Sequence, residues 1–149
     1  MVVPQRKFRE IVFQMLFSQD LGGGVDAKVV SSMLDQLMVT KKTLRHICVK
    51  VSEIVSKIDP IDALISKFSK DYDFNRISRV ERNILRLGVF ELLFDDGIPP
   101  KVAISESIRL SRKFGTPEGG AFVNAILDAI HIAEKKPCLS KIALKKASV

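Results

Sequence analysis

Residues 78–93, Ser-Arg-Val-Glu-Arg-Asn-Ile-Leu-Arg-Leu-Gly-Val-Phe-Glu-Leu-Leu, decide the fold class. Ser78 and Glu81 stand three residues apart, which is the pattern of a capping box, where a hydroxyl and a carboxylate bind free N–H groups at a helix start. The apolar residues that follow cover much of the circumference of a helix: Ile84, Leu85, Leu87, Val89, Phe90, Leu92 and Leu93. A helix that is apolar on most sides has to be surrounded by other elements. We therefore expect this helix to be central in an all-α protein.

Helical periodicity continues on both sides of this segment, and no sustained apolar/polar alternation competes with it. Capping residues and first-turn prolines mark further helix starts: Pro4, Asp26, Thr40, Asp59-Pro60, Pro99-Pro100 and Thr116-Pro117-Glu118. Glycines mark helix ends at 22–24, at 97 and at Gly115, where a left-handed C-cap is expected. The sequence predicts about seven helices, mainly antiparallel, in two packed helical subdomains. We expect one domain at 1–133, with a subdomain break near 70–76, and a basic tail at 134–149.

Composition excludes several classes of protein. With 149 residues, of which 46% are hydrophobic, the chain can bury the core of a single domain. No apolar run approaches the length of a membrane span, and the first residues lack the apolar core of a signal peptide, so we expect a soluble cytoplasmic protein without a membrane partner. The two cysteines, Cys48 and Cys138, stand far apart, and neither His46 nor His131 lies at ligand spacing from them. We therefore expect no metal site.

The excess of positive charge lies at the two ends of the chain. The net charge is +7. Residues 1–9 contain Arg6, Lys7 and Arg9 without an acid, and residues 134–149 contain five lysines against Glu134, which leaves 16 basic and 16 acidic residues between them. Basic ends on a neutral body suit a polyanion better than a small acidic substrate. A solubilising role is the alternative for the tail.

No catalytic motif stands in the sequence. There is no phosphate-binding Gly-x-x-x-x-Gly-Lys, no His-Glu-x-x-His and no Gly-x-Ser-x-Gly. The residues 22–24, Gly-Gly-Gly, follow a predicted helix rather than a strand, so we interpret them as a linker. We expect neither enzymatic activity nor a cofactor.

Three basic clusters are candidate binding residues. Arg6, Lys7 and Arg9 stand in the first turns of a predicted helix, where cations oppose the helix dipole, and phosphate contact would explain that placement as well as ordinary surface charge would. The second cluster shares one helix face with Glu81, and pairing within the protein is its alternative: Arg79, Arg82 and Arg86. The third lies near a helix C-terminus, where cations stabilise the helix whether or not they bind a ligand: Arg109, Arg112 and Lys113.

An aromatic residue follows a glycine pair in the last predicted helix. Phe122 can belong to the core, or its ring can stack on an unpaired base. Gly119 and Gly120 can allow a partner's backbone to approach closely, or they can be slack that the helix tolerates.

Three stretches together resemble the NusB family of transcription antitermination factors. The first begins with Arg-Lys-Phe-Arg-Glu at 6–10 and continues through Leu16-Phe17, and the second is Arg-Ile-Ser-Arg-Val-Glu-Arg-Asn-Ile-Leu-Arg-Leu-Gly-Val-Phe-Glu-Leu at 76–92. The third is Ile-Pro-Pro-Lys-Val-Ala-Ile-Ser-Glu-Ser-Ile at 98–108, followed by Phe114-Gly115 and by Phe-Val-Asn-Ala-Ile-Leu-Asp at 122–128. The resemblance extends over about residues 6–130. It implies an all-α fold and a non-catalytic adaptor that binds boxA-type, single-stranded RNA of ribosomal RNA transcripts together with NusE, a small-subunit ribosomal protein. The transcribing RNA polymerase complex is then an indirect partner.

The resemblance also implies site residues. Arg6, Lys7 and Arg9 match the family's basic RNA-binding segment. Glu118, Phe122 and Asn124 match the region that borders the family's RNA surface. Glu81 and Arg82 match the helix start that is associated with NusE binding. Two departures stand near Phe122: residues 119–121 are Gly-Gly-Ala where the family has a lysine or a similar polar residue, and Ala125 replaces a usual glycine.

Two other functions compete with the RNA-binding adaptor. One is a protein–protein scaffold that binds NusE with weak or no RNA binding of its own, as the altered segment 119–121 would allow. The other is the N-terminal module of a ribosomal RNA cytosine methyltransferase. We expect the methyltransferase least, because no glycine-rich cofactor motif stands in the chain.

Overall fold

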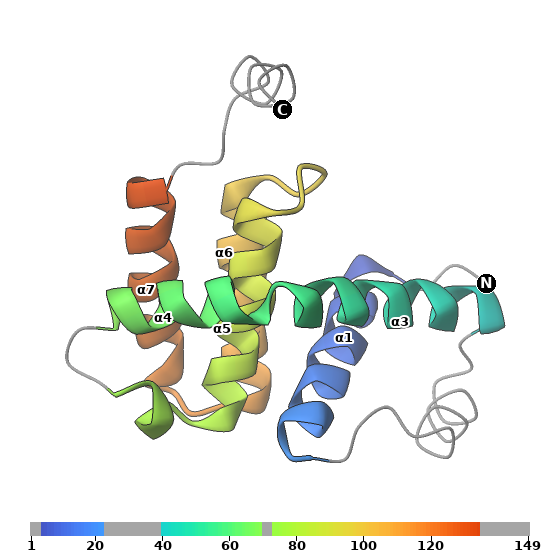
Figure 1. Cartoon of the computed structure of the whole chain (residues 1–149), viewed down its shortest axis with the longest axis horizontal. Helices are drawn as coiled ribbons and strands as arrows, with labels where there is room; N and C mark the ends of the chain where they lie inside the picture. Colours follow the sequence, from blue (N-terminus) through green and yellow to red (C-terminus); the bar gives the residue numbers. More distant parts are fainter. Residues whose placement is uncertain (1–3, 23–39, 70–72, 135–149) are drawn as a thin grey trace.

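The computed structural model describes residues 4–22, 40–69 and 73–134, and within these ranges the protein is all-α (Figure 1). Its elements are α1 (Gln5–Asp20), α3 (Lys41–Ser56), α4 (Ile58–Phe68), the short 3₁₀-helix η1 (Phe74–Arg76), α5 (Arg79–Leu93), α6 (Pro100–Phe114) and α7 (Gly119–Glu134). The predicted all-helical class is confirmed, and six α-helices fall in the described part of the chain. The helix expected after Asp26 lies outside the described residues, as does the basic tail.

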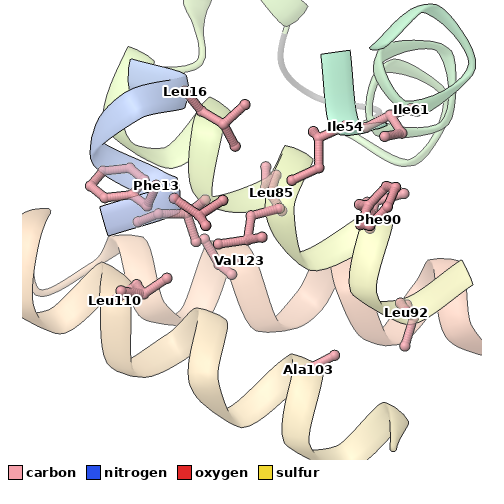
Figure 2. Close-up of a cluster of buried hydrophobic side chains, with 14 of the residues drawn as sticks. Phe13, Leu16, Ile54, Ile61, Leu85, Phe90, Leu92, Ala103, Leu110 and Val123 are labelled. Carbon is pink, nitrogen blue, oxygen red and sulfur yellow. The ribbon is translucent and has the colours of Figure 1, made fainter. Parts of the chain in front are cut away.

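Helix α5 is central, as the sequence predicts. Every residue from 83 to 92 is buried, and the helix packs against α1, α3, α4, α6 and α7. The Ser78 hydroxyl accepts a hydrogen bond from the Glu81 N–H at 3.2 Å, which gives the expected N-cap. In Figure 2, Leu85, Phe90 and Leu92 of α5 lie among buried side chains of the surrounding helices, such as Phe13 and Leu110. This core fixes where α1, α6 and α7 present their outer residues.

Two expected helix boundaries are wrong in detail. Helix α4 begins at Ile58 rather than at Asp59-Pro60, so only Lys57 separates it from α3. A proline inside the first turn is tolerated, because the first N–H groups of a helix have no partner within it. Gly115 has extended backbone angles (φ −111°, ψ −156°), not left-handed ones. A Cβ there would lie 2.9 Å from the Ser111 carbonyl oxygen, so close contact with its own helix is what favours glycine.

Gly88 lies where α5 meets α6 and α7. A Cβ on Gly88 would lie 2.6 Å from Ser107 Oγ and 2.9 Å from Leu127 Cδ1. Gly88→Ala should therefore lower the free energy of unfolding by about 1–3 kcal/mol, because the added methyl overpacks a buried contact. Urea denaturation measures the change. Gly120→Ala is the matched control, since its nearest neighbour atom would be 3.7 Å away and alanine favours a helix. Equal stability of the two variants would contradict the close approach of the three helices.

In the part of the chain that the structure describes, no helix has the length and apolar character needed to cross a membrane.

Candidate nucleic-acid interface

The basic start of α1 lies beside α6, and the two helices run in the same direction. Arg6 contacts Glu106, Glu10 contacts Arg109 and Lys113, and Phe13 contacts Phe114, so contact partners advance together along both helices. The basic segment of α1 therefore lies alongside the charged side chains of α6.

Arg9 is inside the protein. Only 7% of it is exposed, and its Nε donates to both carboxylate oxygens of Glu91 at 2.9 and 3.1 Å. Its Nη1 donates to Glu106 Oε1 at 3.3 Å. Arg9 thus ties α1 to α5 and α6, and the structure does not bring it to the surface with Arg6 and Lys7. A sequence signal existed: residues 9, 12, 13 and 16 recur at the spacing of one buried helix face.

The outer residues of the same segment remain exposed. The side chains of Arg6 and Lys7 are 73% and 45% exposed, and they contact Glu106 and Glu10 only at 3.6 and 3.7 Å. Contacts of that length at the surface contribute little, so both cations can exchange them for a phosphate group.

Glu10 is the carboxylate beneath this surface. It accepts hydrogen bonds from Arg109 Nη1 at 2.8 Å and from Lys113 Nζ at 3.0 Å. Burial favours the neutral form of Glu10, but the bonds from Arg109 and Lys113 outweigh it and lower the pKa of the carboxyl below its ordinary value. Glu10 is therefore ionised at neutral pH and orders the cations around it.

A pocket of about 200 Å³ lies between α5 and the start of α7. Its lining includes three residues from the sequence-based predictions: Glu81, Glu118 and Phe122. Glu118 is exposed and Phe122 is half-buried. Asn124 is exposed and does not line this pocket. The structure thus groups Glu81, which the sequence assigned to a protein partner, with two candidate RNA-binding residues.

Gly119 allows Glu81 to lie against the start of α7. A Cβ on Gly119 would lie 2.5 Å from Glu81 Oε1, whereas a Cβ on Gly120 would make an ordinary contact of 3.7 Å with Ile108 Cγ2. Burial raises the pKa of Glu81 above its ordinary value, and the hydrogen bond from its partner Ser78 offsets only part of that effect. Gly119 therefore leaves room for a side chain of this protein itself, and the approach of a partner's backbone to the glycine pair stays a prediction.

The second basic cluster is largely paired within the protein. Arg86 forms two 2.8 Å hydrogen bonds to the Asp62 carboxylate. Arg82 contacts Asp20 at 3.5 Å and lies over the Phe74 ring at 4.9 Å from its centre. Arg82 and Arg86 therefore hold α5 to α1, α4 and η1. Their carboxylate partners stand in distant segments, so spacing along the chain could not reveal them.

An apolar groove of about 300 Å³ lies on the other side of the first turn of α5. It is lined by Phe13, Gln14, Phe17, Val80 and Phe114. Val80 lines this groove, and the next residue, Glu81, lines the pocket that contains Phe122. The start of α5 therefore separates the groove from the pocket. The described residues contain no cluster of ligating side chains that would hold a metal ion.

Comparison with known proteins gives a consistent family. The model of the NusB family matches residues 6–131. A transcription antitermination protein NusB from Desulfosudis oleivorans is 33% identical over 130 residues, which cover 85% of this chain and 84% of the relative. The corresponding protein of Myxococcus xanthus is 34% identical over 137 residues, with 89% of this chain and 98% of the relative covered.

Solved structures agree with the sequence comparison. T. maritima NusB superposes with a TM-score of 0.79 at 35% identity, covering 96% of this chain and 99% of the other. A crystal structure of the antitermination factors NusB and NusE in complex with dsRNA gives a TM-score of 0.74 at 29% identity, covering 87% and 96% of the two chains.

Proposed function

The chain belongs to the NusB family of transcription antitermination proteins, and from this we propose that it is a non-catalytic, RNA-binding adaptor that works together with NusE. A related structure contains NusB, NusE and RNA in one complex, which supports both partners. We propose boxA-type RNA of ribosomal RNA transcripts as the ligand, the transcribing polymerase complex as an indirect partner, and the cytoplasm as the location. Residues 1–133 would act as one domain with a break near 70–76.

The observation that carries the RNA-binding role is the exposed pair Arg6 and Lys7. Both cations stand in the first turn of α1, where they oppose the helix dipole, and neither is held by a short ion pair. Phosphate groups would neutralise them. Arg9 takes a different role in this proposal: it holds the basic helix in place from inside.

The pocket at the start of α7 is the proposed base-contacting part of the surface. Phe122 offers an aromatic ring, and Glu81 and Glu118 offer carboxylates that accept hydrogen bonds from base amino groups. Asn124 lies further along α7 and would contact RNA outside this pocket.

For NusE we propose the side of α5 that faces the apolar groove. A groove with three phenylalanines and a valine can bury apolar side chains of a protein partner. Glu81 and Arg82 follow Val80 at this helix start, and we keep them in the proposal as residues near the NusE contact, although Glu81 also lines the pocket that contains Phe122.

The test is RNA binding by the protein alone and with NusE, over a series of salt concentrations, with boxA-type RNA in single-stranded and double-stranded form. We expect NusE to increase RNA affinity and the logarithm of affinity to fall linearly with the logarithm of salt concentration. If the protein binds NusE but adds nothing to RNA affinity, the result would favour the alternative function, a protein–protein scaffold. The sequence Gly-Gly-Ala at 119–121, which lacks the family's polar residue, points to that alternative.

A further inference from the structure

We propose that the last turn of α6 is a second phosphate-binding surface, formed by Arg112 and Lys113, positioned by Arg109, and connecting the basic start of α1 to the start of α7. The inference rests on the proposed RNA-binding function and extends its site. Sequence alone left this cluster open, because cations near a helix C-terminus stabilise the helix in any case.

Arg109 joins α6 to the first turn of α1. Its Nη1 donates to Glu10 at 2.8 Å, its Nη2 to the Arg6 carbonyl oxygen at 3.3 Å, and its Nε to Glu106 at 2.6 Å. All three of its nitrogens are engaged within the protein. Arg109 is therefore a positioning residue, which sets the basic segments of the two helices side by side.

Lys113 lies next to Lys7, although more than a hundred residues separate them in the chain. The Nζ atoms of both contact the same carboxylate oxygen of Glu10, at 3.0 and 3.7 Å. Glu10 is almost completely buried, whereas the side chains of Lys7 and Lys113 are 45% and 51% exposed. The two ammonium groups thus share a surface above one buried carboxylate.

The carboxylates do not neutralise this surface. Three acids, Glu10, Glu91 and Glu106, face five cations: Arg6, Lys7, Arg9, Arg109 and Lys113. Arg112 is exposed and makes no ion pair with any described residue. A polyanion such as an RNA strand would supply the missing negative charge.

The last turn of α6 also contacts the start of α7. A Cβ on Gly119 would lie 2.8 Å from Ser111 Oγ, so the residue just before Arg112 lies against the first turn of α7. Glu118 and Phe122 stand at that turn. The last turn of α6 thus contacts both the basic start of α1, through Lys113, and the first turn of α7, through Ser111. Arg112 and Lys113 therefore lie between the two parts of the RNA surface that the sequence predicted separately.

The test compares two double variants that remove the same charge. Arg112→Gln with Lys113→Gln changes the proposed surface. Lys67→Gln with Lys101→Gln is the matched control, since both lysines are exposed and stand on α4 and at the opposite end of α6. Each is titrated with boxA-type RNA, with NusE bound, at several salt concentrations, and thermal unfolding is recorded in parallel.

We expect about tenfold weaker RNA binding at low salt for the Arg112 and Lys113 variant, with a salt slope reduced by about 1 to 2, and wild-type behaviour for the control. A stability loss with unchanged RNA affinity and slope would overturn the proposal in favour of a purely structural role. If the double variant does not fold, Arg112→Gln alone decides, because that side chain makes no ion pair with the described residues. Absence of RNA binding by the wild-type protein would instead contradict the proposed function itself.

Discussion

Arg9→Met is expected to lower the free energy of unfolding by about 3–5 kcal/mol, because it removes the guanidinium that donates to buried Glu91 and one of the cations around Glu106. Glu91 is 1% exposed and Glu106 8%, and both accept hydrogen bonds from the Arg9 guanidinium. Methionine fills a similar volume, so the loss reports the removed buried ion pairs rather than a cavity. Urea denaturation at neutral pH measures it.

Arg6→Met is the matched control for this prediction. It removes the same type of charge one turn earlier, but the Arg6 side chain is 73% exposed and its ion pair is 3.6 Å long. We expect a change within about 0.5 kcal/mol. If Arg9→Met unfolds at the wild-type urea concentration, the buried network does not hold α1 in place.

The pH dependence of the Arg9 variant has a defined sign. Burial raises the pKa of Glu91 in the wild-type protein, although Arg9 and Lys50 partly offset that effect. Removing Arg9 takes away one of these offsets. Because the pKa of Glu91 is higher in the folded than in the unfolded protein, the folded protein binds the proton first as pH falls. Stability therefore rises as pH falls through the pKa of Glu91 in the folded state. The difference between variant and wild type should therefore shrink as pH falls from neutral toward that pKa.

The second large effect is expected on RNA binding. Arg6→Glu combined with Lys7→Glu should weaken RNA affinity by at least about tenfold at low salt and reduce the salt slope by about 1.5, because two phosphate contacts are lost. The fold should survive, since acidic residues in the first turn of a helix are favourable. Titration with boxA-type RNA at several salt concentrations, with NusE present, measures both quantities.

Lys41→Glu combined with Lys42→Glu is the control for position and charge. These lysines are also exposed and also stand in the first turn of a helix, α3. Equal losses in both double variants would show that only the overall charge matters. Only Arg6 and Lys7 are reversed in this test. A glutamate in place of Arg9 would be a third anion beside the buried Glu91 and Glu106, and we expect it to unfold the protein.

Local signals predicted much of the helical framework. The Ser78 cap and the apolar circumference behind it located α5, and Thr40 caps α3 by accepting from the Thr43 N–H at 3.1 Å. Such signals involve residues three or four apart on one helix, so they can be found without knowing the fold. The cap expected at Asp59 was wrong, because a proline in the first turn is compatible with more than one starting residue.

The sequence could not assign partners to the charged residues. Arg6, Lys7 and Arg9 look alike along the chain, yet Glu91 and Glu106 bind Arg9 in the interior and leave Lys7 exposed. Likewise, Glu81 was assigned to a protein partner, and only the packing of α7 against α5 brings it beside Phe122. Those contacts join residues that are between 41 and 97 positions apart.

The sequence by itself determined that the protein is helical, that α5 is its centre and that positive charge gathers at the start of α1, because propensity, capping and hydrophobic period are properties of neighbouring residues. Only the tertiary structure decided which cations face outward, since the energy of an ion pair depends on burial and on the distance between groups from different helices. It buried Arg9, paired Arg86, and set Lys113 beside Lys7 above Glu10.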